Sequence, residues 1–219
     1  MTKRSHAALA IAAAAAMLIG GCSGLLHRDA PADQTYVLRT AARPATSAVS
    51  PTADARSSSL RIGRTITAPG LDGDRVVLLR SDHRMDHFAG SRWIAPIPQM
   101  IEDLAAETLR GSGAWSSVHD SQGAFPTDYF LQLDIRRFEA DYTQSEAPTV
   151  HVVLDCTLGR RADRERVVHF VAEGSAAADA NRMTSVIAAF ESAVQSALAI
   201  VAERSQQVLA SGPPAAGGP

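Results

Sequence analysis

The sequence is poor in lysine, cysteine and aromatic residues. Lys3 is the only lysine, there are two cysteines, and aromatic residues make up 5% of the 219 residues. A formal net charge of −2 and a pI near 6.4 exclude the basic surface that nucleic-acid binding requires. Charged residues account for 20% of the chain and hydrophobic residues for 46%, which excludes a disordered chain. We therefore expect one folded domain of about 150 residues, flanked by a removable N-terminal segment and tails.

Motifs of the common enzyme classes are also missing. The close glycine pair Gly111 and Gly113 follows a predicted helix, whereas a phosphate-binding loop opens one. No Gly-x-Ser-x-Gly sequence is present, and Cys156 falls inside a predicted strand with no helix terminus to activate its thiol. The sequence therefore supports neither nucleotide binding nor acyl transfer, and we expect no enzymatic activity and no cofactor.

The N-terminus has the features of an export signal. Lys3 and Arg4 precede thirteen uncharged, mostly apolar residues, 7–19. As a helix this stretch spans about 20 Å, which is short of the roughly 30 Å hydrocarbon core of a bilayer. We therefore expect a cleaved signal peptide over residues 1–21 and no permanent transmembrane anchor.

A cysteine follows the apolar stretch directly. The segment Leu18-Ile19-Gly20-Gly21-Cys22 resembles a bacterial lipobox. The resemblance implies that the Cys22 thiol is diacylglycerated, that the signal is cut before it, and that the new amine is acylated. Several acyl chains, palmitate among them, hold a protein stably at a membrane, whereas one chain does so only marginally. Ser23 after the cysteine implies sorting to the outer membrane. The alternative is an ordinary signal peptide followed by a chance cysteine.

The mature chain is slightly acidic. Removal of residues 1–21 leaves 219 − 21 = 198 residues and a formal charge of 19 − 23 = −4, because Lys3 and Arg4 are lost. Membrane contact should therefore depend on the acyl chains and not on a basic patch. With Cys22 modified, Cys156 has no partner for an intramolecular disulfide, and we expect it to be a small buried hydrophobic residue.

Composition divides the mature chain into four segments. Residues 22–34 predict a short polar tether, and residues 35–204 predict the folded domain. Within that domain, residues 41–59 are rich in Ala, Ser, Thr and Pro and predict a flexible loop. Residues 205–219, which end in a Gly/Pro/Ala-rich stretch, are expected to form a disordered tail.

Period-two alternation predicts the strands, most clearly at 129–138 and 149–158. We expect further strands at 35–39, 60–67, 74–80 and 166–173. The segments 60–67 and 74–80 are expected to pair with each other around the Pro69-Gly70 turn.

Two segments have helical periodicity. Residues 97–109 begin next to Pro98 and end before Gly111, and residues 179–204 carry an apolar stripe that includes Phe190 and Val194. We expect Phe190 and Val194 to face sheet residues, namely Leu131, Leu133, Val152 and Leu154. Together the elements predict a two-layer α/β sandwich, with a mainly antiparallel sheet and two amphipathic helices packed on one face.

Three further features permit a functional or a structural interpretation. The segment Asp82-His83-Arg84-Met85-Asp86-His87 has spacings that suit zinc, but it follows a strand directly and contains Arg84, so we expect a solvated loop and no metal site. Glu102 and Asp103 are expected on the polar face of the first helix, near its N-terminus. Trp93 is either an anchor in an interface or a cover for the sheet edge.

Several short segments match a known family in their order and spacing. They are Tyr36-Val37-Leu38, Pro69-Gly70, Arg75-Val76-Val77-Leu78-Leu79-Arg80, Trp93-Ile94-Ala95-Pro96, Met100, Leu109-Arg110-Gly111-Ser112-Gly113 and Tyr129-Phe130-Leu131. Together with the lipobox, they resemble the ABC-type transport auxiliary lipoprotein (PqiC-like) family over about residues 35–204. The resemblance implies an α/β sandwich that works with MCE-domain (MlaD-like) proteins, an ABC permease and an ATPase in lipid transport. It implies no catalytic residues.

We therefore expect a non-enzymatic lipoprotein on the periplasmic face of the outer membrane, where it docks an MCE partner assembly and where it could also form a homo-oligomer. Turns and connectors carry the matching residues, and binding residues favour such positions. The expected partner-binding residues are Pro69, Gly70, Leu71, Arg75, Arg80 and Trp93. The alternative is a stand-alone periplasmic lipoprotein that binds a small apolar ligand or supports envelope integrity.

Overall fold

The structure is a computed structural model that describes residues 32–40 and 58–211. The chain divides into two compact units, Met1–Asp33 and Gln34–Pro219, and every element given below belongs to the second. The signal peptide and Cys22 lie outside the described residues, as do most of the predicted tether, loop residues 41–57 and the last residues of the predicted tail.

The sheet is built around β7 (Tyr129–Asp141). On one side, β8 (Thr149–Arg160) pairs antiparallel with β7 along its full length, and β9 (Glu165–Ala177) pairs antiparallel with β8. Alternate residues of β7 and β8 are completely buried, including Leu131 and Val152. The predicted period of two is therefore confirmed, and the strands run a few residues further than predicted.

On its other side, β7 pairs in succession with three short parallel strands: β2 (Ser59–Ile62), β3 (Ile66–Thr67) and β4 (Arg75–Leu79). The prediction that 60–67 and 74–80 pair with each other is therefore wrong. Because β7 is 13 residues long, it offers separate positions for all three strands along one edge. The Pro69-Gly70 turn connects β3 to β4 without forming a hairpin.

Three more strands complete the nine-stranded open sheet. β5 (Met85–Trp93) pairs antiparallel with β4, β1 (Gln34–Tyr36) pairs parallel with β5, and β6 (Ser117–His119) pairs parallel with β2. The sequence analysis missed β5 and β6 and assigned the start of β5 to a solvated loop. The first half of β5 is mostly exposed and carries charged residues, so its sequence does not show a clear alternation of apolar and polar residues.

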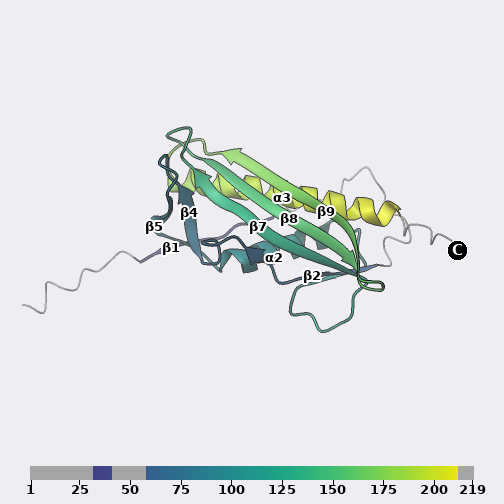
Figure 1. Cartoon of the computed structure of the whole chain (residues 1–219). Coiled ribbons are helices and arrows are strands. Elements are labelled where there is room, and N and C mark those ends of the chain that lie inside the picture. The colour runs from purple at the N-terminus through teal and green to yellow at the C-terminus, as the bar shows by residue number, and fades with distance from the viewer. Residues whose placement is uncertain (1–31, 41–57, 212–219) are drawn as a thin grey trace, which may run out of the picture. The chain divides into compact units, whose positions relative to one another are not determined.

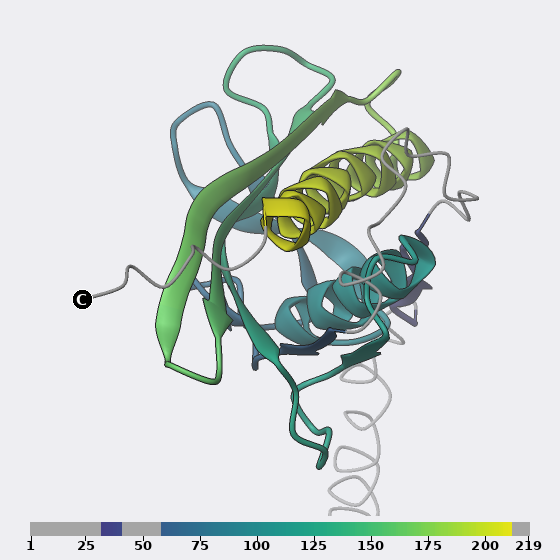
Figure 2. The same ribbon diagram turned by 90° about the vertical axis from the view of Figure 1, so that its right-hand side faces the viewer.

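Two helices pack on one face of this sheet, α2 (Ile97–Gly111) and α3 (Met183–Ser211). Figure 2 shows both on the same side, inside the curve formed by β7, β8 and β9. The predicted two-layer α/β arrangement is therefore confirmed (Figure 1). Residues 205–211 belong to α3 and not to a tail, because Ser205 and Leu209 are buried in the domain.

By length and composition, α3 could cross a membrane over Met183–Ala210, but 56% of its most apolar window is buried in the domain. Phe190 and Val194 are 0% and 2% exposed, which confirms their predicted core position. The Phe190 ring lies 5.0 Å from that of Phe138 and 5.1 Å from that of Trp93, measured between centroids. These contacts identify α3 as the core helix of the domain.

Candidate docking site

The chain turns sharply between β3 and β4. Residues 68–71 form a type II turn in which the Leu71 N–H donates to the Ala68 carbonyl at 3.2 Å. Pro69 supplies the fixed φ of the second position, and Gly70 adopts φ of 89°, which other residues disfavour. Pro69 and Gly70 are exposed, but Leu71 is 1% exposed. The turn is as predicted, whereas Leu71 belongs to the core and cannot contact a partner directly.

A short hairpin turn joins β4 to β5. The Arg80 N–H donates to the Arg84 carbonyl, and the His83 N–H donates to the Arg80 carbonyl, each at 2.9 Å. His83 adopts φ of 62°, as the last residue of a three-residue hairpin loop commonly does. The turn therefore holds several charged side chains in fixed positions at the surface.

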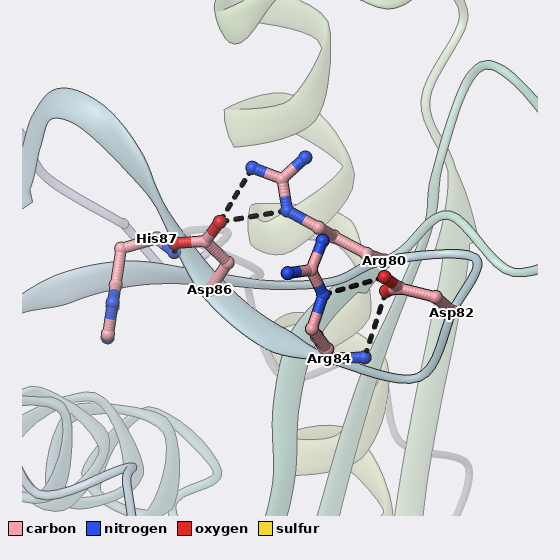
Figure 3. A network of polar contacts seen from close by, with 5 residues as sticks. All are labelled: Arg80, Asp82, Arg84, Asp86 and His87. Carbon is pink, nitrogen blue, oxygen red and sulfur yellow. Dashed lines mark hydrogen bonds and ion pairs between the residues drawn. The ribbon is translucent and has the colours of Figure 1, made fainter.

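Two ion pairs lie at this hairpin, one between its strands and one within its turn (Figure 3). Arg80 lies 2.6 Å from the Asp86 carboxylate, and Arg84 lies 2.6 Å from Asp82. The hydrogen bond from the His87 N–H and the Arg80 guanidinium hold the pKa of Asp86 below its usual value. Because both ion pairs are exposed, each adds little to stability. Their main effect is to orient Arg80 and Arg84 at the surface.

The two predicted arginines lie at opposite ends of β4. Arg80 follows the strand and is exposed, whereas Arg75 begins it and is half-buried. Arg75 is opposite Arg92 of β5, and Arg92 lies 3.7 Å from Asp74. The structure therefore places Arg80 with the hairpin turn and Arg75 deeper in the sheet.

Trp93 is not a surface residue. It is 1% exposed, and its ring packs edge-on against Phe138 and Phe190, with centroids at 5.9 and 5.1 Å. Trp93 is therefore a core residue, and the expectation that it contacts a partner directly is wrong. At the end of β5 alternate residues point inward. Trp93 is one of them, so its side chain enters the core.

Met85 is an exposed apolar residue that the sequence analysis did not propose for docking. It is 49% exposed at the start of β5, and a Cβ placed on Gly70 would lie 3.2 Å from its sulfur atom. The sequence feature that could have identified Met85 is its position as an apolar residue within a run of charged residues. Pro69, Gly70, Arg80 and Met85 together are called the hairpin surface below. This surface combines one oriented cation with an exposed apolar side chain.

The segment 82–87 and Cys156 were the features of the sequence considered for metal binding and for thiol chemistry. Within residues 32–40 and 58–211, no group of three His, Cys, Asp or Glu residues could hold a metal ion. Cys156 is completely buried, as predicted, and burial raises the pKa of its thiol to about 12. Its thiolate is therefore scarce at neutral pH.

Glu102 differs from its prediction. It is 8% exposed and accepts hydrogen bonds from the Thr65 N–H at 3.3 Å and the Ser121 N–H at 2.9 Å. The carboxylate thus ties α2 to the segment before β3 and to the loop after β6. Helical phase alone could not reveal this, because both partners are distant in sequence.

The fold has solved relatives. The crystal structure of protein XCC0632 from Xanthomonas campestris superposes with a TM-score of 0.66 at 22% identity, covering 80% of this chain and 96% of that chain. Hypothetical protein CT253 from Chlamydia trachomatis superposes with a TM-score of 0.52 at 6% identity, covering 71% and 99%. At these identities the similarity establishes the fold alone. No curated protein matches the chain.

The sequence itself identifies the family. Residues 36–202 match the sequence model described as the ABC-type transport auxiliary lipoprotein component. This range runs from the last residue of β1 into α3. The chain therefore belongs to the ABC-type transport auxiliary lipoprotein family, and the resemblance noted in the sequence is confirmed.

Proposed function

We propose that this protein is a non-enzymatic subunit of an MCE-type ABC lipid transport system, anchored through acylated Cys22 on the periplasmic face of the outer membrane. The observation that carries the proposal is the family match, which spans 36–202. The lipobox before Cys22 agrees with it independently. In this role the protein docks an MCE-domain (MlaD-like) partner, which in turn contacts the permease and ATPase.

The hairpin surface is the docking site that we propose. Arg80 is held by Asp86 with its guanidinium at the surface, and Met85, which precedes Asp86 in β5, offers an exposed apolar contact. Arginine and methionine are enriched in interfaces, and arginine is also common among the residues that dominate binding energy. Leu71 anchors the Pro69-Gly70 turn in the core, whereas Arg75 and Trp93 lie at the other end of the β4–β5 pair. The mature chain is only slightly acidic, so affinity should come from these contacts more than from long-range attraction.

Pull-down of the MCE partner by the membrane-anchored protein tests this assignment. Replacing both Arg80 and Met85 with alanine should weaken capture by about tenfold or more, since both groups leave the contact. The matched control is Arg161→Ala, because Arg161 is also exposed but lies in the β8–β9 turn. Melting temperatures of all variants should stay close to that of the parent.

Two results would count against this proposal. If the double variant captures the partner as well as the parent does, the hairpin surface is not the docking site. If no MCE protein is captured by the parent in detergent, while a small apolar ligand co-purifies with it, the stand-alone lipoprotein is the better assignment.

A further inference from the structure

β9 has a free edge. It pairs with β8 along one edge, and among the described residues no strand pairs with the other. β9 is 13 residues long, contains no proline, and lies at the margin of the sheet in Figure 1. Alternate residues of such a strand direct their N–H and C=O groups outward. The edge is therefore a template for another extended strand.

Apolar side chains are left at the surface along this edge. Val171 is 47% exposed on the face of the sheet that lacks the helices. On the helix face, Val168 and Phe170 contact the core but remain partly exposed. A strand laid against β9 would cover all three side chains, and burial of apolar surface favours such pairing.

We propose that β9 pairs antiparallel with β9 of a second copy of this chain, about a two-fold axis at Val171, so that one sheet continues through a dimer. This inference is independent of the proposed lipid transport role. Opposite residues of an antiparallel pair lie on the same face, so the axis must pass through a residue and not between two. Val171 is the midpoint of β9, since (165 + 177)/2 = 171.

This register matches charge as well as apolar surface. Val171 lies opposite Val171 of the second copy, and His169 lies opposite Glu173 of the second copy. The Nε2 of His169 lies 2.5 Å from the Asp155 carboxylate, and in its protonated form the ring would also offer its Nδ1–H to that glutamate. A β-bulge next to Arg166 ends the regular ladder, which therefore runs from Val168 to Gly174 in each copy.

An axis at Phe170 would place His169 opposite Val171 and Glu173 opposite Val167, so it would form no charge pair. Other registers are also worse. An axis at Glu173 would oppose two glutamates, and an axis at His169 would oppose Glu173 to Glu165 of the second copy. An axis at Ala172 would oppose Val171 to Glu173. Like charges directly opposite each other destabilise a strand pair. Charge complementarity therefore selects a second copy in the Val171 register.

Disulfide trapping tests the register directly. In the full mature lipoprotein in detergent, Val171→Cys should form a disulfide-linked dimer under mild oxidation with diamide, because directly opposed Cα atoms lie about 4.5 to 5.5 Å apart. The control is Ile66→Cys, which is similarly exposed but lies on β3. Cys156 is buried and should not react. Equal trapping of both variants would overturn the proposal.

A charge experiment separates a second copy from any other occupant. Val171→Asp and Val171→Lys each place like charges across the axis and should raise the dimer Kd about tenfold or more. An equimolar mixture of the two variants should recover dimers that native mass spectrometry identifies as heterodimers. A parent that is monomeric at every concentration, or variants that dimerise as the parent does, would overturn the proposal. Binding of an extended peptide from another protein, with no self-association, would also overturn it.

Discussion

Gly174 shows how one residue sets the distance between the helix and the sheet. A Cβ placed on Gly174 would lie 1.8 Å from the carbonyl oxygen of Ala193 in α3. This contact is with backbone, so no side-chain rotation can relieve it. The buried Ala193 and Ala197 on the facing side of α3 allow the same close approach. The packing of α3 on β9 therefore requires the absence of a side chain at Gly174.

Gly174→Ala should lower the free energy of unfolding by about 3 kcal/mol or more, because α3 must move away from the sheet. Gly111→Ala is the matched control, since a Cβ there meets nothing within 4 Å and Gly111 ends α2. That control should be neutral or slightly stabilising. Urea unfolding of both variants measures the difference, and equal stability of the two would contradict the close approach.

At the scale of an element, α3 is held by the aromatic cluster of Trp93, Phe138 and Phe190. Each ring contacts the other two, at centroid distances between 5.0 and 5.9 Å. The three residues come from β5, β7 and α3, so the cluster joins the helix to the middle of the sheet. Its loss should destabilise the whole domain and not one element.

Phe190→Ala should cost about 3 to 5 kcal/mol, from lost transfer free energy and from the cavity that remains. Ser192→Ala lies on the exposed side of the same helix and should change stability by less than about 0.5 kcal/mol. Thermal unfolding followed by circular dichroism distinguishes them. A Phe190→Ala variant as stable as the Ser192→Ala variant would show that the cluster does not support α3.

Asp128 links β2 to the beginning of β7 through hydrogen bonds. Its carboxylate accepts hydrogen bonds from the Ser59 hydroxyl at 2.7 Å and the Ser59 N–H at 2.8 Å. These hydrogen bonds lower the pKa of Asp128 in the folded protein. A carboxyl with a lowered folded pKa contributes stability above its unfolded pKa, and that contribution is lost as the pH falls through the folded value.

Asp128→Ala should therefore be less stable than the parent at pH 7, and the difference should shrink as the pH falls below about 4, near the unfolded pKa of aspartate. Asp72→Ala, at an exposed position, is the control for the loss of a surface carboxylate. Urea midpoints between pH 2 and 7 provide the measurement. A difference that does not change with pH would contradict the role of the ionised carboxylate.

At the scale of the whole molecule, we propose that the acyl chains on Cys22 attach the protein to the membrane. With the proposed cleavage before Cys22, the chain would carry a formal charge of −4, so anionic lipid would not attract it. Salt should accordingly have little effect on attachment, whereas detergent should release the protein. The Val171 dimer, if both copies share a membrane, would also gain from their raised local concentration.

Cys22→Ala should give a soluble protein or an uncleaved precursor, because the anchor loses all of its hydrocarbon. Intact-mass measurement of the parent should show acyl mass on a chain that begins at Cys22. Membrane fractionation should place the parent with the outer membrane before and after a high-salt wash. If the mature parent carries no acyl mass, the proposed lipid anchor is wrong. If the parent is recovered with the inner membrane, the outer-membrane assignment is wrong.

The sequence by itself determined the two-layer fold, because local alternation and helical periodicity record which side of each element is buried. Leu131, Val152 and Phe190 occupy the core for this reason. The matching segments also identified the family. Only the tertiary structure decided that β2, β3 and β4 share one edge of β7, because strand pairing depends on residues distant in sequence.

The candidate site, too, was predicted from the sequence only in part. The Pro69-Gly70 turn and the exposure of Arg80 could be predicted, since turn chemistry and charge act locally. The burial of Trp93 depends on Phe138 and Phe190, which the sequence separates from it by 45 and 97 positions. The same holds for the free edge of β9, because a strand becomes an edge only when the rest of the sheet has been assembled. Local pattern therefore determined which face of each regular strand or helix is buried, and long-range contacts decided the burial of single residues such as Trp93 and which surfaces remain for partners.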